Sequence, residues 1–134
     1  MKIFLATFVG LIVAFLSLGL LEIIGHKLFP IPFEIDLTDL ASVKEQIAKI
    51  PVGSLLSVII AHGIGLLLGL IVARLIEKKS LIPLAIIALF ILVGTITNLS
   101  MIPHPMWFMV ADISVVVLVG GGYIYLMNKK ENIG

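Results

Sequence analysis

Two ionisable residues near the end of the first apolar stretch have a spacing that suits a binding site. Glu22 and His26 are four residues apart, so a helix places the carboxylate and the imidazole on one face, one turn apart. This pair suits a shared divalent metal ion, with His104 as a third ligand. His62 or Asp112 could instead complete a tetrahedral or facial-triad set. A metal site is therefore one interpretation of these residues.

The simpler interpretation is a set of structural hydrogen bonds. Glu22 would accept a hydrogen bond from His26 or from Asn98. His62, alone on an apolar helix, would be a core histidine bonded to Thr95 or to a backbone carbonyl, or else a ligand contact or proton relay. Asn98 would join two helices through its side chain. The sequence leaves both interpretations open.

The composition predicts that membrane helices position these side chains. Of the 134 residues, 60% are hydrophobic and 13% are charged, against about 25% charged in a soluble domain. The first apolar run is longer than the core of a signal peptide, so we expect a retained transmembrane helix. The sequence predicts a single integral membrane domain, 1–134, folded as an all-α antiparallel four-helix transmembrane bundle. Four runs provide the roughly 20 residues that a membrane-spanning helix needs: about 3–25, 52–75, 81–102 and 106–127.

The connection between the first two spans contains a short amphipathic helix, predicted at about 37–50. Asp or Thr residues among 36–39 would cap its start. We expect this helix to lie on the membrane surface or to cap the bundle, and a lid over a site is the alternative. Its apolar positions recur at intervals of three and four: Leu40, Val43, Ile47 and Ile50.

The distribution of positive charge predicts the orientation in a cell membrane. Loops on the cytoplasmic side carry an excess of Lys and Arg. Both termini and the loop between the second and third spans are therefore expected in the cytoplasm, and the two Pro-containing loops outside. The cytoplasmic side would hold Lys2, Arg74, Lys78, Lys79, Lys129 and Lys130, and the outer side Lys27, Lys44 and Lys49.

With this orientation, polar residues gather in the outer half of the bundle. His62 lies roughly 15 Å deep and Asp112 roughly 9 Å deep. An ionised carboxylate at the bilayer centre costs about 2.5–3.5 kcal/mol, so Glu22 and Asp112 should face the bundle interior. His104 lies in a Pro-His-Pro turn, which is either a rigid connection or a gate at the mouth of a site. The candidate ligand-binding residues are Glu22, His26, His62, Asn98, His104 and Asp112.

One face of the second span consists of small residues from end to end. Such a face lets a neighbouring helix backbone come close in a membrane. Close packing within the chain is the favoured explanation, and a homo-oligomer or partner interface is the alternative. The face contains Gly53, Ser57, Ala61, Gly65, Gly69 and Ala73.

Several classes of protein are excluded by what the sequence lacks. There is no cysteine, which rules out Cys-ligated metals, iron–sulfur clusters and thiol catalysis. No nucleotide-binding motif is present, and no basic surface could bind nucleic acid. The lipid bilayer is the one partner that the composition itself indicates.

The order of motifs resembles small four-span membrane proteins predicted in many bacterial genomes. The similarity rests on Glu22-Ile-Ile-Gly-His26, then Leu-Phe-Pro, an acidic loop with a short helix, Asn98, and Ile102-Pro-His-Pro-Met-Trp-Phe108. It covers nearly the whole chain and implies a topology but no activity. Small multidrug transporters, by contrast, have their glutamate in the middle of the first helix, whereas Glu22 lies near the end.

Three functional hypotheses follow from these residues. The leading one is a non-catalytic or transport role, in which a polar pocket open to the outer leaflet binds a small ligand, an ion or a lipid head group. The second is a metal-assisted hydrolase or lipid-modifying enzyme that uses Glu22, His26 and a second histidine. The third is a structural subunit that packs through the small-residue face of the second span.

Overall fold

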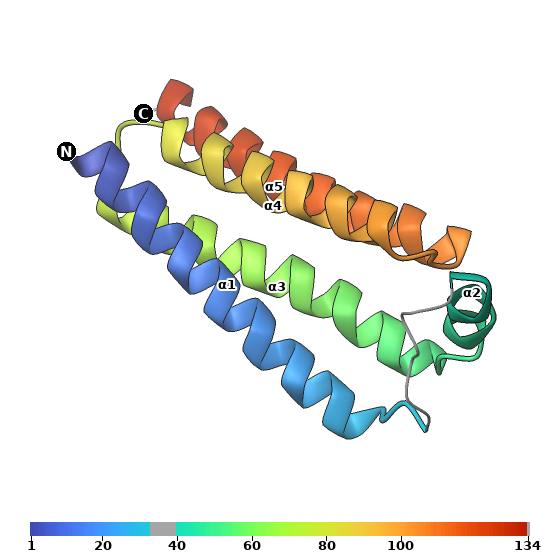
Figure 1. Ribbon diagram of the computed structural model, residues 1–134. Coiled ribbons are helices and arrows are strands. Elements are labelled where there is room, and N and C mark those ends of the chain that lie inside the picture. The colour runs from blue at the N-terminus through green and yellow to red at the C-terminus, as the bar shows by residue number, and fades with distance from the viewer. Residues whose placement is uncertain (33–39, 134) are drawn as a thin grey trace.

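The chain folds as an antiparallel bundle of four long helices, as the sequence predicts (Figure 1). The computed structural model describes residues 1–32 and 40–133. All four long helices are long and apolar enough to cross a membrane, so this is a membrane protein. They are α1 (Lys2–Leu28), α3 (Val52–Ile76), α4 (Ile82–Met101) and α5 (Met106–Ile133), and the short α2 (Leu40–Ala48) lies between α1 and α3.

Both termini lie at one end of the bundle, and α2 lies at the other, which we call the distal end (Figure 1). The predicted capping residues of the short helix, among 36–39, lie outside the described residues. Val43 and Ile47 of α2 are buried, as expected for a helix that covers the bundle. On its exposed side the Lys49 ammonium donates a hydrogen bond to Glu45, which lowers the pKa of that carboxyl.

The helix ends follow from local sequence. Helix α1 stops before Pro30, because a residue that precedes proline avoids the helical conformation. Pro83 stands in the first turn of α4, where its missing N–H leaves no hydrogen bond unmade. Helix α5 continues without a break through the three successive glycines at 120–122.

The small-residue face of α3 lies against α1. A Cβ atom on Gly69 would stand 2.6 Å from the Gly10 carbonyl oxygen, and one on Gly65 would stand 2.9 Å from Leu18 Cβ. Such distances are closer than real Cβ contacts allow, so only glycine fits at these two positions. This is the packing within the chain that the sequence favoured. In this structure α1 covers the face.

The core consists of two apolar clusters with a polar layer between them. Toward the termini, Leu66 and Val116 belong to one cluster; at the distal end, Leu55 and Phe108 belong to the other. Three helices contribute buried polar residues between the two clusters. They are His62 on α3, Thr95 on α4 and Asp112 on α5.

Candidate functional site

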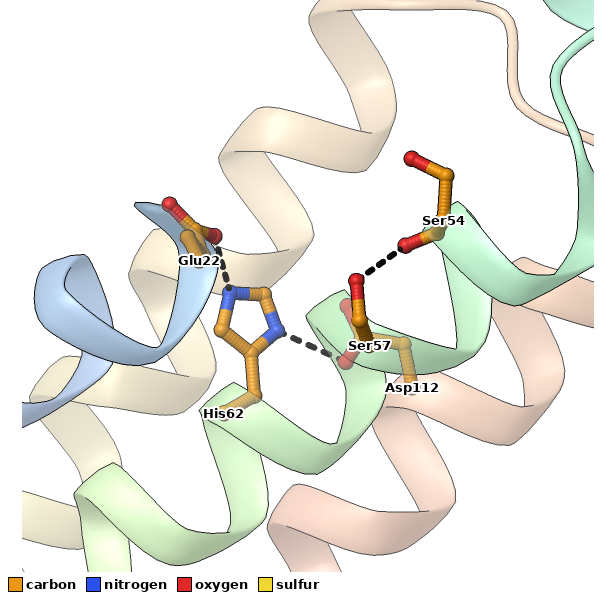
Figure 2. Close-up of polar contacts among 5 residues, drawn as sticks. All are labelled: Glu22, Ser54, Ser57, His62 and Asp112. Atoms are coloured by element: carbon orange, nitrogen blue, oxygen red, sulfur yellow. Dashed lines mark hydrogen bonds and ion pairs between the residues drawn. The ribbon is translucent and has the colours of Figure 1, made fainter. Parts of the chain in front are cut away.

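The centre of the polar layer is a hydrogen bond between α3 and α5. Asp112 is 0% exposed, because it lies one turn after Phe108 and one turn before Val116 on the buried face of α5. Its Oδ1 atom is 2.7 Å from Nδ1 of His62 (Figure 2). The prediction that His62 bonds to Thr95 or to a backbone carbonyl is therefore wrong for Nδ1. Because both groups are buried, this hydrogen bond is a polar link between α3 and α5 inside the core.

This hydrogen bond decides which way the imidazole presents its second nitrogen. An ionised Asp112 has only acceptor atoms, so Nδ1 of His62 must carry the hydrogen. The other nitrogen, Nε2, then faces away from α5 and toward α1. It lies 3.8 Å from Oε1 of Glu22 (Figure 2). That distance is too long for a hydrogen bond, so the two groups interact through charge when His62 is protonated.

Glu22 lies at the boundary between the core and a cavity. Its side chain is 32% exposed, whereas that of His62 is 9% exposed. The sequence predicted a contact of Glu22 with His26 or Asn98, but the ionisable group beside it is His62. Asp112, His62 and Glu22 thus form a line of three ionisable groups, from the buried core to the cavity wall, and each comes from a different helix.

The cavity has a volume of about 310 Å³ and lies among α1, α3 and α4. Glu22 stands six residues from the distal end of α1, about 9 Å along the axis, and Asn98 is nearer still to the end of α4. Phe15 and Phe90 lie deeper and meet edge to face, with ring centroids 6.0 Å apart. The cavity is therefore polar toward the distal end and apolar toward the middle. It is lined by Phe15, Leu18, Glu22, His62, Phe90, Ile91, Gly94, Thr95 and Asn98.

Gly94 is a wall residue that the sequence did not single out. A Cβ atom at this position would meet nothing within 4 Å. Glycine is therefore not needed there for helix packing, in contrast to Gly65 and Gly69. An isolated glycine in an apolar helix was the available signal, but Phe15 and Phe90 look like ordinary lipid-facing residues in the sequence.

The other candidate residues lie apart from this cavity. His26 is exposed near the end of α1. His104 donates from Nδ1 to the carbonyl oxygen of Ile102 at 2.8 Å and stacks on Phe108, with ring centroids 4.9 Å apart. His104 is thus held in the rigid turn between α4 and α5.

The structure does not assemble the metal site that the sequence allowed. Over residues 1–32 and 40–133, no three His, Asp or Glu side chains come together as a metal-binding group. Glu22, His26 and His104 are therefore not a ligand set. The reason is that the four-residue spacing places Glu22 and His26 on one face of a helix but does not determine which neighbouring helix packs against that face.

Comparisons with protein-family models, with curated proteins and with solved structures found no match to this chain. The resemblance to small four-span bacterial membrane proteins accordingly stays a prediction, and the function must be argued from the site itself.

Proposed function

We propose that this protein binds a small amphipathic molecule from the membrane in the cavity among α1, α3 and α4. The observation that carries the proposal is the convergence of Glu22, His62 and Asn98 on one end of a cavity whose other end is aromatic. The polar group of the ligand contacts these three residues. Its apolar part lies against Phe15 and Phe90.

The dimensions of the cavity support a small ligand. Ligand pockets in proteins hold about 300–1,000 Å³, and a cavity of about 310 Å³ is at the lower end of that range. A head group and a short chain fit this space, whereas a whole phospholipid would extend out of it. Asn98 and Gly94 are exposed on α4, so a ligand enters sideways, from the lipid between α1 and α4.

The charges of the loops support an orientation with the distal end outside. The six Lys and Arg residues at the end with the termini outnumber the three near the distal end, and the excess belongs in the cytoplasm. In this orientation both termini are cytoplasmic. The polar end of the cavity then faces the outer leaflet, from which the ligand comes.

Histidine signals offer a direct test, because the chain has only three histidines. His62 lies in the cavity wall, and His26 and His104 lie outside it. In protein labelled with ¹³C at histidine, n-octylamine or n-octanol should shift the His62 signal saturably and leave the other two unchanged. If neither compound shifts His62, the proposal is wrong.

A matched pair of glycine variants locates the binding. Gly94→Leu places a side chain in the cavity wall, and Gly122→Leu places one on α5 outside the residues that line it. Neither new Cβ would meet an atom within 4 Å, so both variants should fold. Gly94→Leu should abolish the shift of His62, and Gly122→Leu should retain it. Equal responses from the two variants would contradict binding in this cavity.

A second candidate, an enzyme, is favoured by one feature of the same site. A carboxylate that holds one imidazole nitrogen and directs the other toward a cavity is the arrangement of a general base. Asp112 and His62 have this arrangement. If His62 performs catalysis on a lipid, overproduction of the wild type but not of His62→Gln will change the lipid composition of the membrane, measured by mass spectrometry. Unchanged lipids would leave binding as the function.

A further inference from the structure

We propose that the ligand of this cavity is a monovalent organic cation, an amine with an apolar chain, and that it exchanges with one proton at the Glu22–His62 pair. This inference rests on the proposed binding function and adds to it the chemical class of the ligand and the way that protons regulate its binding.

The first step is the charge of the site. Asp112 and Glu22 flank His62 from α5 and α1, and α4 contributes only the uncharged Thr95 and Asn98. With all three groups ionised the charges are −1, −1 and +1, which sum to −1. His26, one turn beyond Glu22, is exposed and does not line the cavity. In this ionisation state the site therefore has a net negative charge within the part of the bundle that spans the membrane.

The second step is what neutralises that charge. An uncompensated charge within the membrane is unfavourable, so it is paired or protonated. One additional proton or one monovalent cation brings the sum to zero. Both would occupy the same carboxylate oxygens, so the two forms exclude each other. When the site holds the proton, binding of the cation therefore releases it.

The third step identifies Glu22 as the exchanging group. Asp112 is 0% exposed and does not line the cavity, and its Oδ1 is hydrogen-bonded to His62. Glu22 is one-third exposed to the cavity and stands 3.8 Å from Nε2 of His62, beyond hydrogen-bond distance. Its carboxylate is thus near enough to His62 to feel its charge, and free to bond an ammonium group on the cavity side.

The fourth step is the choice of an organic cation over a metal ion. Hard metal cations take about six to eight oxygen ligands. Among the described residues that line the cavity, side-chain oxygens come from Glu22, Thr95 and Asn98, which is fewer than such an ion needs. The remaining wall is apolar and ends in the Phe15–Phe90 contact. A carboxylate at one end and aromatic rings at the other fit an ammonium group with a hydrocarbon chain.

The experiment compares probes of equal chain length and different charge. Purified protein in phosphatidylcholine nanodiscs is titrated with n-octylamine, n-octanol, n-octanoate and octyltrimethylammonium, and the His62 signal reports binding. The two cations should bind at least about tenfold more tightly than the alcohol and the carboxylate. Equal affinity for n-octanol and n-octylamine would overturn the cation class while leaving binding in the cavity intact.

Proton release tests the exchange separately. The charge of octyltrimethylammonium does not change with pH, so a proton released on binding in weak buffer comes from the protein. Release should approach one proton per ligand at low pH, where the site holds the exchangeable proton, and should fall to zero at high pH, where it does not. Affinity should rise over the same range. Binding of the cation with no proton release at any pH would overturn the exchange, and empty nanodiscs give the background.

Two variants on α1 assign the group. Glu22→Gln should weaken cation binding at least about tenfold and remove proton release. His26→Gln, one turn away and outside the cavity, should bind and release as the wild type does. Unchanged His104 signals will show that each variant is folded. If Glu22→Gln still releases a proton, Glu22 is not the exchanging group; if no probe shifts His62 even in the wild type, the proposed function itself fails.

Discussion

At the scale of single residues, the Asp112–His62 pair is more informative about function than about stability. Both side chains are buried in a core whose other members are mostly apolar. Within the part of the chain that the structure describes, Asp112 Oδ2 is buried and has no hydrogen-bond partner. Well-packed apolar residues often replace such a pair without loss of stability. Its presence between two apolar clusters therefore favours a use in binding or proton transfer.

Two variants of this pair should differ in stability, because only one of them leaves a buried charge without a partner. His62→Leu leaves the Asp112 carboxylate buried without its partner, and should lower the free energy of unfolding by about 3–5 kcal/mol. The double variant His62→Leu with Asp112→Val removes the charge as well, and should recover most of that loss. Unfolding in mixed detergent, followed by circular dichroism, measures both. A double variant as unstable as the single one would mean that the pair contributes a net stabilisation.

At the scale of elements, α3 is the helix on which the site is built. It contacts α1, α4 and α5, whereas no contact joins α1 to α5 across the described residues. Small residues bring α1 close to one side of α3. His62 projects on another side, where it reaches Asp112 on α5 and faces Glu22 on α1. The close α1–α3 packing therefore fixes the distance between Glu22 and His62.

A substitution in this interface should destabilise the bundle without changing its chemistry. A Cβ on Gly69 would stand 2.6 Å from the Gly10 carbonyl oxygen and 2.7 Å from Ala14 Cβ. Gly69→Ala forces the two helices apart, and should lower the free energy of unfolding by about 1–3 kcal/mol.

Gly121→Ala is the matched control for that substitution. Its new Cβ would meet nothing within 4 Å, and it should be neutral or stabilise the helix by up to about 1 kcal/mol. A Gly69→Ala protein as stable as Gly121→Ala would contradict the close packing. If it instead lost a dimer seen for the wild type, the face would bind a second copy rather than α1.

At the scale of the whole molecule, the sequence was sufficient for the fold and only partly sufficient for the site. Four apolar runs and two short connections leave an antiparallel bundle as the simplest arrangement, and the structure confirms it. Depth along each helix could also be counted, so Glu22 and Asn98 were expected near the outer end of the bundle and His62 near the midplane. The structure places all three on one cavity.

What the sequence could not provide is the rotation of each helix and the order of helices around the bundle. A membrane helix is apolar on all sides, so hydrophobicity does not indicate its inner face. For this reason the pairing of His62 with Asp112 rather than Thr95 was missed. The same ambiguity made Glu22 and His26 look like one site, although only Glu22 lines the cavity. Phe15, Phe90 and Gly94 were missed because wall residues need no particular chemistry.

The orientation of the whole bundle decides which leaflet the cavity serves, and the absence of cysteine makes it easy to measure. Single cysteines replace Glu45 on α2 at the distal end and Lys79 in the loop between α3 and α4 at the other end, both exposed. The excess of Lys and Arg beside the termini predicts that intact cells expose only the distal end. A membrane-impermeant maleimide should therefore label Glu45→Cys in intact cells, and Lys79→Cys only after permeabilisation. The reverse pattern would place the polar end of the cavity in the cytoplasmic leaflet, and the cation would then be taken from inside the cell.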